Sequence, residues 1–470
     1  MIRRLHASFG KKEKIKFATG FTLIEALVVL FIFSLIATTF YSIFSSGTSL
    51  IIEAKNKLKA TSLANEKMEI IRSLDYSQVG IVDSGYIDGD IPSFEEKNLS
   101  GKTFFIFSSV SYVDNPYDGS EGEDPDDDRP ADFKRVAIKV AWENDINTKK
   151  AVFFASDFAP PGVEENISGG TLVIKVLNRD SEGIAGASVN VSNSALGINE
   201  NFITNSNGGV SLPGIPADGK DYQISVSKTD YFSISTLPPY PDSTFNPVYE
   251  HASITDGEKN IYSIVTDRTS DLTLQTKDSF GNTVQGIAYN LTGGIIKSNS
   301  IDSPPVPNYY YSENLNSGSG GENKIEDLGY GNYVFSFSDP SSNYEFIKVL
   351  PFDAPLNDKA KFNIEPGTSV EEKAIFADKN INSLLVTVLD STNFLPIKNA
   401  SVRLHNLSLS EPYDVTLMTD DFGLAFFPVS LPELISETYS MEAKASGYQD
   451  KNESVVINKY TKSELKMDAE

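Results

Sequence analysis

Apolar residues are concentrated in one long stretch near the N-terminus. Between Phe21 and Ile52 the only charged residue is Glu25. The most apolar part runs from Leu23 to Phe44, which as a helix would be about 33 Å long and would match the hydrocarbon core of a bilayer. The pattern predicts one membrane-spanning helix.

Beyond this stretch the apolar positions keep a helical period. They recur at spacings of three and four, with charged residues between them. This spacing predicts that the helix continues to about Leu74 and that its outer half packs on a globular head. The positions are Ala54, Leu58, Thr61, Ala64, Met68 and Ile71, with Leu63, Ile70 and Leu74 widening the stripe.

After the helix the period changes to that of strands. Three segments are rich in apolar and β-branched residues, namely residues 103–113, 133–142 and 150–158, and they predict an antiparallel β head. A proline- and glycine-containing linker follows at 161–170.

The chain then repeats one pattern three times. Each unit has a strand, an Asp-containing turn, a second strand, a later turn with glycine, and a strand that begins at a tyrosine. The units begin about 100 residues apart, so the pattern predicts tandem antiparallel sandwiches and not a solenoid. Their first strands are at Leu172–Val176, Leu272–Leu274 and Leu384–Val388, and their tyrosines are Tyr222, Tyr333 and Tyr439.

The distribution of charge predicts the orientation of the N-terminal helix in the membrane. The formal net charge is −24, but residues 1–20 contain six basic residues and one acidic residue. By the positive-inside rule this leader stays in the cytoplasm, and the part after about residue 50 lies outside. The acidic remainder argues against a role in gripping nucleic acid, and the absence of cysteine excludes disulfides and thiolate metal sites.

The apolar stretch is too long for a secretory signal peptide, and no A-x-A-like cleavage site follows it. A plain membrane anchor fits the length but leaves Glu25 unexplained. A carboxylate within a span is costly and by default a functional candidate that needs a partner.

The segment Gly20-Phe21-Thr22-Leu23-Ile24-Glu25 resembles the cleavage and methylation motif of type IV prepilins and of the pseudopilins of type II secretion systems. The resemblance implies cleavage after Gly20 by a prepilin peptidase and N-methylation of Phe21. It also implies that Glu25 pairs with the terminal amine of a neighbouring pilin, which would give the buried charge its partner. Many major pilins bend this helix at a proline, but here the position is Ser42, which favours a minor pilin or pseudopilin.

The three repeats resemble carboxypeptidase regulatory-like or Cna-B-type immunoglobulin-like modules, which serve as spacers or binding scaffolds. The expected fold is thus α+β in the N-terminal pilin part, followed by all-β tandem immunoglobulin-like sandwiches. The expected division is a basic leader (1–20), a transmembrane or filament-core helix (21–52), the helix continuation with the β head (53–160), the linker (161–170) and sandwiches at 171–268, 269–380 and 381–470.

Two further features leave alternatives open. Nine acidic residues lie between Asp114 and Asp132, and they could hold calcium or form a solvated hairpin insertion. Tyr309, Tyr310 and Tyr311 follow three prolines in what we expect to be a long loop. They could face a glycan or protein ligand, or could cover the end of a sandwich.

No motif of a known catalytic class is present, and apart from calcium we expect no cofactor and no enzyme activity. Three hypotheses remain: a minor pilin or pseudopilin in a filament, an adhesin displayed by pilin processing, and a membrane-anchored stalk. The expected partners are the prepilin peptidase, other pilins, the cytoplasmic membrane and an extracellular ligand. The expected location is single-pass in the cytoplasmic membrane, and the cell surface or pilus after assembly.

Overall fold

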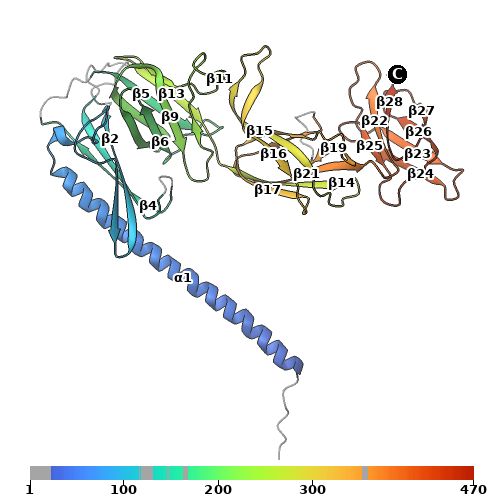
Figure 1. Cartoon of the computed structure of the whole chain (residues 1–470), viewed down its shortest axis with the longest axis horizontal. Coiled ribbons are helices and arrows are strands. Elements are labelled where there is room, and N and C mark those ends of the chain that lie inside the picture. Colours follow the sequence, from blue (N-terminus) through green and yellow to red (C-terminus); the bar gives the residue numbers. More distant parts are fainter. Residues whose placement is uncertain (1–22, 116, 118–130, 145–147, 162–167, 352–357) are drawn as a thin grey trace, which may run out of the picture.

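In the computed structural model, one long helix leads into a row of β domains (Figure 1). The structure describes residues 23–115, 117, 131–144, 148–161, 168–351 and 358–470. Helix α1 leaves the first domain at one end of the row, and the C-terminus lies at the other end. This confirms the expected fold class: a long apolar N-terminal helix followed by sandwich-like β domains.

Helix α1 (Leu23–Arg72) runs without interruption, as the absence of proline allows. Its C-terminal part buries one stripe, comprising Ala60, Leu63, Ala64, Met68 and Ile71. Three expected members of that stripe, Ala54, Leu58 and Ile70, are exposed. The helical period was predicted correctly, but these three residues were wrongly expected to be buried, because the head covers only one narrow face of α1. After α1 the chain makes a short 3-10 turn, η1 (Tyr76–Gln78).

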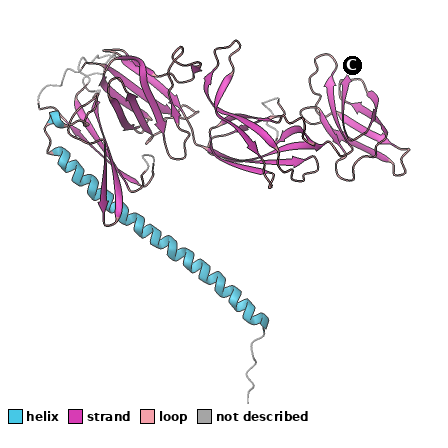
Figure 2. Ribbon diagram, in the orientation of Figure 1, coloured by secondary structure: helices cyan, strands magenta, loops and turns pink. Residues whose placement is uncertain are grey.

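The head is a four-stranded antiparallel sheet in the order β1-β2-β3-β4, with α1 packed on β3 and β4. Three of its strands match the predicted segments: β2 (Lys102–Val113), β3 (Phe133–Ala141) and β4 (Ala151–Phe158). The fourth, β1 (Phe94–Leu99), was not predicted. Figure 2 shows the helix against this sheet and the strand-rich remainder of the chain.

Sandwich 1 follows the head. One sheet has the order β13-β5-β8, and the other has the order β10-β9-β6-β7 with β12 also on β9. Its strands are β5 (Gly170–Leu177), β6 (Ser188–Asn193), β7 (Ile198–Ile203), β8 (Gly209–Ile215), β9 (Asp218–Ser227), β10 (Ile234–Ser235), β12 (Ala252–Ile254) and β13 (Lys259–Val265). Gly170, expected as the last linker residue, is thus the first residue of β5.

Sandwich 2 pairs a sheet of order β17-β14-β21-β19 with one of order β11-β15-β18-β20, in which β16 also joins β15. Its strands are β14 (Ser270–Asp278), β15 (Ala288–Asn299), β16 (Pro307–Asn316), β17 (Glu322–Leu328), β18 (Gly331–Ser336), β19 (Tyr344–Leu350), β20 (Lys361–Ile364) and β21 (Ser369–Asp378).

Sandwich 3 has sheets of order β25-β22-β28 and β24-β23-β26-β27. Its strands are β22 (Ser383–Asp390), β23 (Ser401–Asn406), β24 (Tyr413–Met418), β25 (Leu424–Phe427), β26 (Thr438–Lys444), β27 (Lys451–Val456) and β28 (Tyr460–Met467).

The residues that recur in the three sequence units make similar buried contacts in each sandwich. Tyr222, Tyr333 and Tyr439 are fully buried, and each hydroxyl bonds to the backbone a few residues upstream. This arrangement resembles the tyrosine corner of immunoglobulin-like sandwiches. Glycines at matching turns accept a hydrogen bond from the first strand, as in Val176 N to Gly208 O and Val388 N to Gly423 O, both 2.8 Å.

One expectation about pairing was wrong. The sandwiches are not wholly antiparallel, because the first and last strands of each pair in parallel: β5 with β13, β14 with β21, and β22 with β28. Alternation along a strand shows which residues are buried but carries no information about the neighbouring strand or its direction.

The domains are joined by specific contacts. Tyr86 of the head packs on the cores of both the head and sandwich 1, and its hydroxyl donates to Pro213 O at 2.6 Å. Strand β11 (Asn246–Pro247) leaves sandwich 1 and pairs with β15 of sandwich 2. Lys348 of sandwich 2 lies 2.6 Å from Asp420 of sandwich 3.

Candidate functional site: the N-terminal helix and its junction with the head

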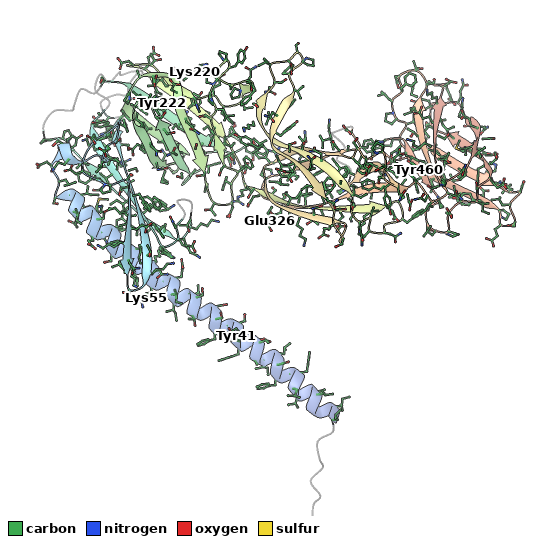
Figure 3. All side chains as sticks on the ribbon, viewed as in Figure 1. Tyr41, Lys55, Lys220, Tyr222, Glu326 and Tyr460 are labelled. Atoms are coloured by element: carbon green, nitrogen blue, oxygen red, sulfur yellow. The ribbon has the colours of Figure 1, made fainter. Side chains whose placement is uncertain are left out.

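The N-terminal half of α1 exposes an almost continuous apolar surface. Between Leu27 and Ile52 every residue is exposed except Gly47, which is half-buried. Phe40, for example, is 71 % exposed. In Figure 3 these side chains, with Tyr41 among them, project from the part of α1 that extends beyond the head. Exposed apolar area on this scale indicates contact with lipid or with other proteins.

By length and composition α1 could cross a membrane, since its most apolar window has a mean hydropathy of 2.3 and is wholly exposed. The polar side chains within it do not break the helix. Ser34 and Thr38 donate their hydroxyls to carbonyls three residues earlier, and Thr39 to one four residues earlier. Such bonds satisfy the hydroxyls inside a low-dielectric environment.

Polar contacts mark the point where α1 meets the head. The indole N–H of Trp142, the only tryptophan in the chain, donates to Glu53 Oε2 at 3.2 Å. Trp142 itself is buried. Lys59 Nζ donates to Leu99 O at 3.2 Å. These hydrogen bonds connect the head to α1 from Glu53 onward.

Towards the C-terminal end of α1, two ion pairs connect the helix to β1. Lys97 Nζ lies 2.8 Å from Glu66 Oε1, and Lys67 pairs with Glu95. The charges are complementary, since Glu66 and Lys67 of the helix pair with Lys97 and Glu95 of the strand, and β1 is also paired with β2 at six positions.

A groove of about 560 Å³ lies where α1 leaves the head. The helix supplies an apolar wall that includes Tyr41 and Phe44, and the head supplies charged residues that include Glu143 and Lys150. Lys150 Nζ donates to Glu143 at 2.6 Å, and this bond is the main reason why the pKa of Glu143 is below its usual range. The groove thus presents apolar and charged surface side by side at the end of the exposed helix.

Of the motif residues predicted from the sequence, Gly20 and Phe21 lie outside the described residues. Glu25 lies within α1, but its side chain is not among those described. The acidic run from Asp114 to Asp132 is also mostly outside the described residues. In the described part of the chain, no three His, Asp or Glu side chains gather as a metal site would require.

The three adjacent tyrosines are not in a loop. Tyr309, Tyr310 and Tyr311 lie in β16, paired with β15, and all three are half-buried. Tyr310 packs edge-on against Phe232 at 5.3 Å between ring centroids, and Tyr311 packs against the buried Tyr333. The prolines before them suggested a loop, but the strand begins at the last of these, Pro307. Tyr310 and Tyr311 therefore have packing roles.

Tyr309 differs from its neighbours because it lines a groove of about 400 Å³ at the junction of sandwiches 1 and 2. Tyr249 and Tyr330 line the same groove, as do Asn332 and the backbone of two glycines, and none of its lining residues is charged. Sequence reasoning found only Tyr309, because the other two tyrosines come from distant segments that no local pattern connects.

Comparison with known proteins supports the assignment of the N-terminus. Residues 16–41 match the prokaryotic N-terminal methylation motif. The chain therefore has a prepilin-like N-terminus, and the matched segment includes Gly20, Phe21 and Glu25. No curated protein sequence matches this chain.

The chain is also similar, at low identity, to solved structures of other proteins. The Bacillus anthracis TIE protein is 15 % identical over 81 % of this chain and 74 % of its own, with a TM-score of 0.19. The Streptococcal ancillary pilin is 14 % identical over 64 % of this chain and 99 % of its own, with a TM-score of 0.19. GBS52, the minor pilin of Streptococcus agalactiae, is 14 % identical over 44 % of this chain and 96 % of its own, with a TM-score of 0.20.

Proposed function

We propose that this chain is a minor pilin or pseudopilin of a type IV pilus-like or type II secretion-like filament. It is cut after Gly20 by a prepilin peptidase, N-methylated at Phe21 and held in the cytoplasmic membrane by α1 until it joins the filament. Its three sandwiches then project outward for attachment or as a spacer. The observation that carries this proposal is the methylation motif at residues 16–41, continuous with a helix whose apolar surface is exposed.

We also propose sandwich limits at 171–268, 269–380 and 381–470, a relation of the repeats to carboxypeptidase regulatory-like or Cna-B-type modules, and a non-enzymatic role. The unbent α1 favours a minor over a major subunit, because nothing in it provides the proline bend common in major pilins.

Replacement of Glu25 tests the filament role. In Glu25→Ala cells we expect cleavage and membrane insertion to continue while incorporation into sheared filaments is lost, because the neighbour's terminal amine loses its partner. Ser34→Ala is the matched control, since it removes a polar group from the same exposed helix and should leave incorporation unchanged. Normal incorporation of Glu25→Ala would contradict the filament role.

A second candidate function is adhesion without a filament role. The uncharged groove with Tyr249, Tyr309 and Tyr330 favours a neutral glycan, because tyrosine rings offer rigid amphipathic surface and Asn332 offers an amide. Glycan-array binding by the full chain in detergent should be lost on Tyr309→Ala and kept on Tyr240→Ala, a change at an exposed tyrosine outside the groove. Equal binding by both variants would exclude the groove.

A further inference from the structure

The way in which the chain enters and leaves each sandwich determines how the sandwich responds to tension. The chain enters sandwich 2 at the start of β14 and leaves it at the end of β21. These strands are hydrogen-bonded neighbours and run in parallel, from Asp271 opposite Ser369 to Asp278 opposite Phe376. The entrance and the exit therefore lie at opposite ends of one strand pair.

Tension applied through the chain would pull β14 and β21 in opposite directions along their length. All eight paired positions would then be loaded at once, because the strands must slide past each other before any hydrogen bond is released. If the pair were antiparallel, entrance and exit would lie at the same end and the bonds would break one at a time. The observed direction of pairing resists tension in shear.

Burial strengthens this resistance. Leu274 of β14 and Phe376 of β21 are fully buried in the core of sandwich 2. Sliding by a single residue would turn the apolar side chains of one strand away from the core, because alternate residues face opposite sides. The strands cannot slip in small steps without exposing this core.

Sandwich 2 also protects both strands from peeling. In its sheet, β17 flanks β14 and β19 flanks β21, so neither is an edge strand. In sandwich 1 the last strand, β13, lies at an edge, and in sandwich 3 β28 does. The same parallel pairing is present in all three, but among the described strands only sandwich 2 holds both of its loaded strands inside a sheet.

The connections between sandwiches are short enough to transmit tension. Four residues separate β13 from β14, and four separate β21 from β22. Four residues span at most about 14 Å, so little slack can be drawn out before the next sandwich is loaded. The pairing of β11 with β15 adds a second attachment between sandwiches 1 and 2.

We propose that sandwiches 1 and 2 form a tension-bearing column between the membrane-proximal helix and whatever sandwich 3 attaches to, with sandwich 2 the stronger. This role rests on the proposed surface display, because only a chain held at both ends is under tension. The property itself belongs to the fold and can be measured without a filament.

The absence of cysteine in the chain allows a direct test. Handles attached to Asp271→Cys and Asn380→Cys pull sandwich 2 along the natural path, in shear. Handles attached to Asp271→Cys and Ser369→Cys pull apart two residues that face each other, which opens the same strand pair from its end. Asp271, Ser369 and Asn380 are exposed, so the core is unchanged.

Both double variants are studied as the full chain in detergent by single-molecule force spectroscopy at one loading rate. We expect rupture in shear to need roughly twofold or more the force of rupture from the end, since the bonds are loaded together. Equal forces in the two geometries would overturn the proposal. A failure here leaves the filament proposal intact, because neither pair touches α1, and loss of filament incorporation would likewise leave the force measurement unaffected.

Thermal unfolding checks that both variants are folded as the natural chain is. If Ser369→Cys lowers the melting temperature, Glu371→Cys replaces it, since Glu371 is exposed and also lies near the start of β21 opposite Thr273.

Discussion

The hydroxyl of Thr419 offers a quantitative test of how each sandwich is held together. This side chain is buried in sandwich 3, where its Oγ1 accepts from Ala400 N at 2.8 Å and donates to Ile397 O at 2.6 Å. Thr419→Val keeps the shape but leaves one buried N–H and one buried C=O without this partner. Each such group costs about 1–3 kcal/mol, so for the two groups together we expect a loss of about 2–6 kcal/mol.

Hydrogen exchange followed by mass spectrometry measures this loss within one sandwich. Every 1.4 kcal/mol corresponds to a factor of ten, so amides of β22 and β23 that exchange through unfolding of sandwich 3 should exchange about 30- to 20,000-fold faster. Amides of sandwich 1 should be unaffected. Thr204→Val should show the reverse pattern, because Thr204 makes the equivalent pair of bonds to Ala187 N and Ile184 O.

Thr416→Val is the matched control, since Thr416 is an exposed residue of β24 in the same sandwich. Its effect should stay within about 0.5 kcal/mol. If Thr419→Val changed exchange no more than Thr416→Val, the Thr419 hydroxyl would not stabilise the turn. If protection from exchange fell equally in sandwich 1, the sandwiches would not be separately stable units.

Two further predictions concern the head and its boundary with sandwich 1. Burial raises the pKa of Glu200, which faces Ser84 at the boundary of the head and sandwich 1. Folding therefore disfavours the charged form of Glu200, and this destabilisation appears as the pH rises through the folded pKa. Glu200→Gln should raise the melting temperature at pH 7.5 but not near pH 4. An equal change at both pH values would contradict this. The single tryptophan of the chain, Trp142, lies in the core of the head, so tryptophan fluorescence reports on unfolding of the head. This transition should not coincide with the circular dichroism transition of the sandwiches. Met68→Ala should shift the fluorescence transition alone, by a loss of about 2–5 kcal/mol, and a shift of both transitions would show that the domains unfold together.

The sequence predicted the elements whose burial is periodic. α1, β2, β3 and β4 were found because their apolar spacing reflects which face is covered. β1 was missed because its sequence, FEEKNL, is mostly polar. β1 is held by its pairing with β2 and by ion pairs to Glu66 and Lys67 of α1, and no pattern within six residues contains that information.

Features that depend on which segments meet could not be predicted. The parallel pairing of β14 with β21 joins strands about 100 residues apart. The bond between Glu53 and Trp142 joins the end of the apolar stretch to the end of β3. In the groove at the junction of sandwiches 1 and 2, Tyr249, Tyr309 and Tyr330 come from three separate segments. Local signals nevertheless placed the prepilin-like motif, because its residues lie in one short contiguous segment and the motif needs no tertiary contact.

The intact mass and N-terminal peptide of the mature protein, purified from its native membrane, test the central claim most directly. The proposal predicts a chain that begins at N-methylated Phe21, lacking residues 1–20. An unmodified chain that still carries the leader, or one that begins at any other residue, would contradict the proposed processing and with it the pilin role.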